Sequence, residues 1–399
     1  MLERSAKSAR FSSPDTMQLT LSEQLSQFSN VLQQLLFPIL TPTLGPMSDR
    51  AALFIAVCAM VPLRPLLPQG RWPGRPSKDR LAIARAFLVK SVSGLAHTRQ
   101  LLDTLKTDHS LRQLCGWDHP AQLPHESTFS RAFAEFAHSQ LSTAAHEALV
   151  RATQSGRLIG HIARDGSAIE ARERFPETKP CETPKVKIKK KPKKRRTIKE
   201  SAISRAIPKT RLQKQLQDKT VHAMLKGVPT ACDIGGKRAN NGHVKWWRGY
   251  KLHLDVADGQ IPISALLTAA SVHDSQVAIP LMEMSSKRVT YLYDIMDSAY
   301  DAATIRQAST DRKHQPIIHP NTRPKSKTQL PVRVKPQPQL SPAQAERYKE
   351  RTMVERVFGR LKDEFGAGQF RVRGAQKVMA HLMFGVLALT VDQLLRLHP

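Results

Sequence analysis

Cysteine is scarce in this chain of 399 residues: there are four, and no two of them form a C-x-x-C pair. Zinc fingers and disulfide frameworks both require closely spaced or numerous cysteines, so the spacing argues against both classes of protein. The four positions are Cys58, Cys115, Cys181 and Cys232. We expect isolated, reduced thiols in a cytoplasmic protein.

Long hydrophobic runs are also missing. The longest, Ala51–Leu63, has 13 residues, whereas a membrane-spanning helix needs about 20. Met1–Asp15 lacks the apolar stretch of a signal peptide. The sequence therefore predicts a soluble protein with no membrane partner, in which residues 51–63 form a buried helix.

Acidic residues are few, with 33 aspartates and glutamates against 62 lysines and arginines. An excess of this size repels itself unless a polyanion compensates it, and the usual polyanion is nucleic acid. The basic residues are spread over most of the chain. This distribution favours a DNA-binding protein over a neutral enzyme with one charged tail.

The basic residues are densest inside a low-complexity segment at about 175–230, which we expect to be a disordered insert. Residues 185–199 contain ten lysines or arginines, including Lys189, Lys190, Arg195 and Arg196. Such a run cannot pack into a core, so it is either a solvated linker or an arm that contacts DNA phosphates. A second segment, rich in proline and lysine, is expected to be a linker at about 321–340.

The chain is long enough for two domains. Helical periodicity predicts an all-α domain in residues 1–155, while residues 156–399 have the pattern of an α/β domain. In the first domain helices are expected at Lys78–Val92, His97–Lys106, Ser110–Cys115 and Ser127–Ala152.

The last of these helices carries three phenylalanines at helical spacing, Phe129, Phe133 and Phe136. They should face the core, with Ser127 or Thr128 as the N-terminal cap. Arg131 would then point outward near the helix N-terminus, where a recognition helix meets DNA. The alternative is a short helical bundle that makes no DNA contact.

In the second domain a β-rich run ends at Asp165, and two further runs are joined by the short link Ala257–Gln260, which predicts a hairpin. A buried strand then leads into Asp297. The remaining expected elements are helices at Ser275–Met284 and Ala302–Ala308, a strand at Gln315–Pro320, and an apolar C-terminal helix packed on the sheet. This order predicts an α/β fold in which helices cover a mixed sheet.

The stretch Ser341–Phe365 reads as one long helix, with Ser341 as its cap and proline at the first helical position. Tyr348, Arg351, Glu355 and Lys362 follow at offsets that place them within roughly 60° of one face. Such a stripe is ordinarily a solvated, salt-bridged surface. The stripe would be part of an active site only if other segments of the chain place further functional side chains beside Glu355.

Those side chains are two aspartates. The order of elements resembles that of an RNase H-like sheet, and this resemblance implies an active site with one acid from the first strand, one from the end of a neighbouring strand and one from a later helix. The matching residues are Asp165, Asp297 and Glu355. Closely spaced carboxylates are tolerable only with cations between them, and oxygen ligands suit Mg²⁺. We therefore expect these three to be the catalytic residues and the ligands of two metal ions.

Nearby polar residues are expected to have structural roles. Asp274 and Asp301 should cap the helices that follow them, and Asp294 should be a structural or exposed acid. Trp246 and Trp247 either pack beside a strand or stack on an unpaired base.

The spacing Tyr348-x2-Arg351-x3-Glu355-x6-Lys362 resembles the Y-(2)-R-(3)-E-(6)-K signature of the DDE transposases of bacterial insertion sequences. Four other segments agree with that family: Arg164–Gly166, Arg248–Leu254, His273–Ser275 and Asp297–Asp301. The resemblance covers most of the chain from about residue 50 onward, except for the basic insert.

The resemblance implies that the chain binds the terminal inverted repeats of an insertion sequence, cleaves a DNA strand and joins the 3′-hydroxyl end to target DNA. The three acids would bind two Mg²⁺ ions, for which Mn²⁺ would substitute. Arg351 and Lys362 would hold phosphates, with Tyr348 beside them.

Because two ends of double-stranded DNA must be held together, the resemblance also implies a homodimer or a larger synaptic complex in the bacterial cytoplasm. Asp297 and Glu355 are separated by 57 residues, mostly linker. This interval does not suit the large β-rich insert that helps some relatives make a DNA hairpin. The alternatives are a metal-dependent nuclease that does not transpose and an inactive DNA-binding protein.

Overall fold

The computed structural model describes residues 27–28, 31, 48–67, 78–173, 209–238, 243–321 and 340–397. The centre of the basic insert, with Lys189, Lys190, Arg195 and Arg196, and the linker at 322–339 lie outside these residues. Up to residue 155 the described part is helical, as the sequence predicts. Its helices are α3 (Asp49–Met60), α4 (Leu63–Leu66), α5 (Arg80–Val92), α6 (Thr98–Thr107), α7 (His109–Cys115), α8 (Glu126–His138) and α9 (Leu141–Gln154).

The predicted helix Ser127–Ala152 is in fact two helices, α8 and α9. They separate at Gln140, whose φ of 55° is left-handed and cannot continue an α-helix. The predicted cap is also wrong, because His125 is the N-cap of α8 and its Nδ1 accepts a hydrogen bond from the amide of Ser127. Arg131 lies exposed on α8, and its Nε donates to the Ser127 carbonyl.

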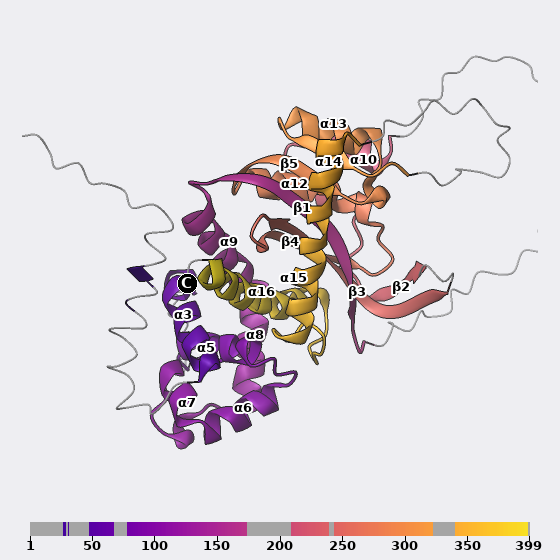
Figure 1. Cartoon of the computed structure of the whole chain (residues 1–399). Coiled ribbons are helices and arrows are strands. Elements are labelled where there is room, and N and C mark those ends of the chain that lie inside the picture. The colour runs from indigo at the N-terminus through magenta and orange to yellow at the C-terminus, as the bar shows by residue number, and fades with distance from the viewer. Residues whose placement is uncertain are drawn as a thin grey trace, which may run out of the picture.

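The three phenylalanines of α8 are buried, as predicted, and surround Phe87 of α5. Phe384 of the C-terminal helix α16 (Ala375–Leu397) stacks on the same ring at 6.0 Å. The helix α16 contacts α3, α5, α8 and α9 as well as strand β4. The prediction that it packs on the sheet is therefore incomplete, because it also forms the centre of the helical part (Figure 1).

By length and composition α16 could cross a membrane, but most of it is buried inside the protein. Its apolar surface contacts helices and sheet. It therefore gives no indication of a membrane partner.

The sheet has six strands, in the order β2-β3-β1-β5-β6, with β4 paired to β3. Strands β1, β3 and β4 are antiparallel neighbours, whereas β1, β5 and β6 run parallel, so the sheet is mixed, as predicted. The predicted hairpin is β3–β4. The strands are β1 (Leu158–Glu170), β2 (Asp233–Arg238), β3 (Val244–Ala257), β4 (Ile261–Ala269), β5 (Thr290–Met296) and β6 (Gln315–Ile318).

Two helices that pack beside these strands come between β4 and β6 in the chain. They are α12 (Ala278–Ser286) and α13 (Ala303–Asp311). The predicted insert is shorter than expected at its C-terminal end. Residues 209–230 include α10 (Arg211–Gln217) and α11 (Val221–Leu225), which contact α12 and α13. Leu212, Leu216 and Met224 give these two helices an apolar face, which packs into a small core on that side of the sheet.

The stretch Ser341–Phe365 begins as predicted, with Ser341 Oγ accepting from the amide of Gln344. It is not one α-helix, however. A 3₁₀ turn, Lys349–Arg351, separates α14 (Pro342–Tyr348) from α15 (Thr352–Asp363). The turn contacts β1 and β5, and α15 contacts β1 and β3, so the second half of the stretch lies along the centre of the sheet.

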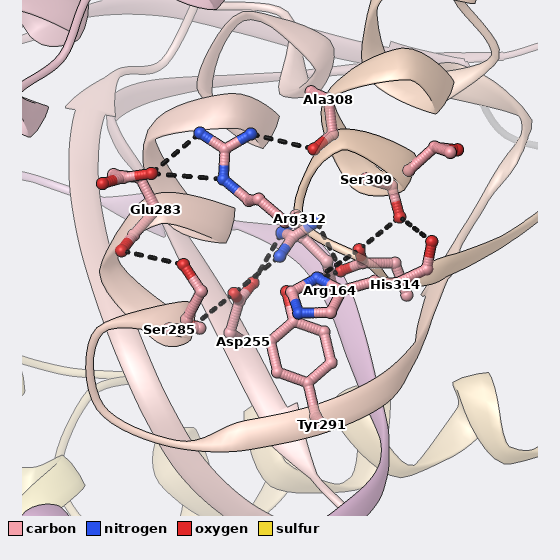
Figure 2. A network of polar contacts seen from close by, with 12 residues as sticks. Arg164, Asp255, Glu283, Ser285, Tyr291, Ala308, Ser309, Arg312 and His314 are labelled. Carbon is pink, nitrogen blue, oxygen red and sulfur yellow. Dashed lines mark hydrogen bonds and ion pairs between the residues drawn. The ribbon is translucent and has the colours of Figure 1, made fainter.

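A buried ion cluster fixes the three central strands relative to one another (Figure 2). Arg164 of β1 donates from Nε and Nη2 to the two carboxylate oxygens of Asp255 on β3, both at 2.7 Å. Its Nη1 lies 3.3 Å from Asp294 of β5. All three side chains are 0% exposed. Asp294 is thus a structural acid, as expected, and the register that the cluster fixes also places the neighbouring residue, Asp165.

Candidate active site

Asp165 and Asp297 lie on adjacent parallel strands. Arg164 pairs with Met296 in the β1–β5 register, so Asp165 is the next residue of β1 and Asp297 is the residue directly after the last residue of β5. Asp297 follows the end of β5 and caps a 3₁₀ turn, accepting from the amide of Ala299 at 2.9 Å. Asp165 is not at a strand end as predicted, because β1 continues to Glu170. The side chain of Asp165 nevertheless lies at the edge formed by the end of β5.

The pKa of Asp165 is raised to about 6, first by burial and then by the negative charges of Asp297 and Asp274. The Gly166 amide, which donates to Asp165 Oδ1 at 2.7 Å, and the Arg351 guanidinium oppose this shift. The pKa of Asp297 is raised as well, through burial and the charge of Asp274. The fold therefore holds carboxylates close together at a cost that a cation would remove.

Arg351 joins two of the three predicted acids. Its guanidinium lies 3.6 Å from Asp165 Oδ2 and donates to Glu355 Oε1 at 2.6 Å. The family resemblance predicts that Arg351 holds a phosphate. In the structure it is the ion-pair partner of both acids, because the 3₁₀ turn places its side chain between α15 and β1. Glu355 stays 52% exposed.

Tyr348 and Lys362 lie near the same edge. Lys362 Nζ donates to Ser167 Oγ of β1 at 2.7 Å, two residues from Asp165. The helix α15 continues without interruption through Gly359, so this glycine does not rotate Lys362 away. The pKa of Tyr348 is raised, mainly by burial, and the charges of Asp297 and Asp165 add to the shift. Arg351 thus contacts Asp165 directly, Tyr348 feels the charge of both aspartates, and Lys362 is bound to β1 two residues further along.

The sequence did not predict the contact between Asp274 and β1. Asp274 does not cap its helix as expected, since His273 is the cap and Asp274 Oδ1 instead lies 3.0 Å from Lys251 Nζ. A Cβ at position 166 would meet that same oxygen at 2.6 Å, so any larger residue there would force Asp274 to shift. The segments Arg164–Gly166 and His273–Ser275 could be recognised in the sequence. Their contact in space, between Gly166 and Asp274, could not be predicted from it.

Asp301 was also expected to cap a helix. Its Oδ1 instead accepts from Arg306, and its Oδ2 accepts from the amide of Asn321. The cap position of α13 is Ala302. Trp247 is buried, as packing predicts, while Trp246 is 67% exposed.

The donor set suits a hard divalent cation, but the acids are not gathered into a complete metal site. Within the described ranges no group of three or more His, Cys, Asp or Glu side chains is arranged to hold a metal ion. Asp165 and Asp297 supply buried carboxylates with raised pKa values, which fits an oxygen-ligated cation. Glu355 is bound to Arg351 and is 52% exposed.

We expect Asp165→Asn to stabilise the protein in the absence of divalent cations. The folded protein binds the Asp165 proton more tightly than the unfolded chain does, so this carboxyl lowers stability as pH rises from about 4 to about 6. Above about pH 6 the full cost is present, of order 1–3 kcal/mol. Asparagine removes the charge and can still accept from the Gly166 amide.

Denaturant unfolding in EDTA at pH 7.5 should therefore show a higher midpoint for Asp165→Asn than for the wild type, and the difference should vanish near pH 4. A variant that is less stable at pH 7.5 would show that Asp165 is not under electrostatic strain.

Residues 160–391 match the family model described as Transposase DDE domain, and residues 57–135 match the one described as Transposase domain (DUF772). The first match includes all three predicted acids and the second includes helices α5 to α7. No curated protein and no solved structure matches the chain.

Proposed function

The chain belongs to the family of transposases with a DDE domain, and we propose that it binds the terminal inverted repeats of a bacterial insertion sequence, cleaves a DNA strand there and joins the 3′-hydroxyl end to target DNA. The family carries the RNase H-like fold that the order of its elements predicts. One observation supports the site above all others: Asp165 on β1 lies in register beside the end of the parallel strand β5, which Asp297 directly follows, and Arg351 links Asp165 to Glu355.

In this proposal Asp165, Asp297 and Glu355 hold two Mg²⁺ ions, with Mn²⁺ as a substitute. When bound, the ions supply activation of the attacking oxygen and stabilisation of the leaving oxygen. The protein's own contribution is the close placement of acidic side chains by β1 and β5, whose register the buried Arg164 fixes.

Arg351 has two roles in turn. In the free protein its guanidinium neutralises Asp165 and Glu355. When DNA is bound, the guanidinium leaves the acids and binds a phosphate of the transposon end, for which its planar fork of donors is well suited. Glu355 is then free to turn toward Asp165. Lys362 binds a second phosphate, and Tyr348 packs beside the strand.

The helical part, with Arg131 on α8, is proposed to contact the terminal repeats, and the basic segment with Lys189, Lys190, Arg195 and Arg196 to contact phosphates without sequence preference. Because both ends of the element must be held at once, the active form is proposed to be a homodimer or a larger synaptic complex on double-stranded DNA. It would act in the bacterial cytoplasm, at the nucleoid.

The test is strand transfer in vitro. A labelled duplex with the inverted-repeat sequence that flanks the gene is incubated with the protein, a supercoiled target plasmid and Mg²⁺, and the label is expected to join the plasmid. Cleavage of the duplex without joining would identify a nuclease, and binding without cleavage would identify an inactive DNA-binding protein. Joining in EDTA would contradict the role of the metal.

A further inference from the structure

Two cavities share part of their lining, one within the helical part and one between the helical part and the sheet. One, of about 670 Å³, is lined by residues of α5, α6 and α8 and by the segment that connects α15 to α16. The other, of about 510 Å³, is lined by the end of β1, by β3 and by the same connecting segment. Ala96, His97 and Arg371 line both cavities. The two therefore form one continuous depression, which we call the basic trough.

The trough is strongly cationic. Three acidic side chains line it, Asp103, Glu126 and Glu170. The lining also has six basic side chains that reach solvent: Arg99, Arg172, Arg248, Arg371, Arg373 and Lys377. Arg99 lies 3.9 Å from Glu126, a long and exposed ion pair that contributes little energy. The lining therefore keeps an excess of positive charge for an anionic ligand.

The arginines of the connecting segment are held by a well-anchored backbone. The Ala367 amide donates to the Leu361 carbonyl, and the Gly368 amide donates to the Lys362 carbonyl. At its far end the Gly374 amide donates to Glu173 Oε1 at 2.8 Å. Arg371 and Arg373 thus project from a segment fixed at both ends, which lowers the entropy lost when they bind a ligand.

The trough also leads to the candidate active site. Glu170 lines it at the end of β1, five residues along the same strand from Asp165. At the rise of an extended strand this separation is about 16 Å, the length of about five base pairs of duplex. The connecting segment follows directly after α15, which carries Glu355 and Lys362. DNA whose scissile phosphate lies at Asp165 can therefore continue into the trough.

We propose that the basic trough binds the phosphate backbone of the DNA duplex a few base pairs away from the cleaved phosphate. Several guanidinium groups spread along an extended depression suit a row of phosphates better than they suit a single small anion. This inference rests on the proposed function, because it takes the DNA of that reaction as the ligand. It assigns a DNA-binding role to the connection between α15 and α16, for which the motifs of the sequence gave none.

The test is the salt dependence of DNA binding by the full chain. For the wild type and the variant Arg371→Ala/Arg373→Ala, the Kd for a labelled duplex with the inverted-repeat end is measured over a range of NaCl concentrations. Each phosphate contact contributes about 0.9 to the slope of log K against log salt, so the slope should fall by about 2 in the variant. The variant Arg99→Ala/Arg172→Ala, with changes on other elements, should show a similar fall.

The matched control is Arg151→Ala/Lys287→Ala, which removes two half-exposed charges that do not line the trough. Its slope should equal that of the wild type. Slopes that are unchanged in both trough variants would overturn the inference, as would an equal fall in the control. If the trough instead binds an acidic protein segment or a second copy of the chain, the slope of log K against log salt for DNA binding would be unchanged in the trough variants. The two proposals can be refuted separately. If the protein binds DNA through the trough but joins no strands, the proposed function is wrong and the DNA-binding role of the trough stands.

Discussion

Asp165→Asn, Asp297→Asn and Glu355→Gln should each abolish strand joining in the transfer assay, with a loss of more than about 100-fold. Each change removes the negative charge of an oxygen ligand while leaving its shape. Changing residues that only support a metal ligand already costs about 10- to 100-fold, so losing a ligand's charge should cost more. DNA binding should persist, since phosphate contacts come from other residues.

Matched controls are available on neighbouring elements. Glu346→Gln lies on α14 and its side chain is 74% exposed, and Asp311→Asn ends α13 in an exposed position. Both should join strands at the wild-type rate. Unchanged joining in any of the three site variants would remove that residue from the assignment. The expected gain in stability of Asp165→Asn would show that its inactivity is not caused by misfolding.

Arg164→Met should lower the free energy of unfolding by about 3–5 kcal/mol. Removing one partner of a buried ion pair leaves the other charge uncompensated in a medium of low polarity. Here two carboxylates, Asp255 and Asp294, are 0% exposed and both face Arg164. Hydrogen bonds from Ser285 and Ser309, each 2.6 Å long, would remain, but they cannot replace a full positive charge.

Guanidinium chloride unfolding at pH 7.5 measures this loss, and Arg151→Ala provides the comparison. Arg151 pairs with Glu147 at the surface and is 54% exposed, so its removal should cost less than about 1 kcal/mol. A loss for Arg164→Met no larger than that of Arg151→Ala would show that the buried cluster does not fix the sheet. Strand joining should also fall, because the register places Asp165 beside Asp297.

Much of the fold follows from local patterns. The hairpin β3–β4 is marked by its short turn, and the strand β5 by a buried run that ends at Asp297. The spacing of the three phenylalanines of α8 correctly predicted which face of the helix is buried. These features depend on residues near one another in the chain, which is why periodicity and turn chemistry predicted them.

The failures concern contacts between distant segments. Residues 209–230 are mostly polar, so the sequence did not predict α10 and α11. Their few apolar residues stabilise these helices only by packing against α12 and the sheet. The apolar sequence of α16 indicated burial but not which surfaces would cover it.

Within the site, spacing alone predicted that the stripe from Tyr348 to Lys362 faces one way, and in the structure Arg351 contacts Asp165 while Lys362 contacts Ser167 of the same strand. Spacing could not reveal the 3₁₀ turn before α15, nor that Arg351 would pair with Asp165 as well as with its helical neighbour Glu355. That pairing depends on the cost of unpaired neighbouring carboxylates, which appears only when the strands are assembled.

The most direct test of the account is a crystal structure of the protein with its DNA end and Mn²⁺, using the anomalous scattering of the metal. We expect anomalous peaks in contact with carboxylate oxygens of Asp165, Asp297 and Glu355, with the Arg351 guanidinium moved from these acids to a DNA phosphate. Metal bound elsewhere, or a complex in which Arg351 still joins Asp165 and Glu355, would contradict it.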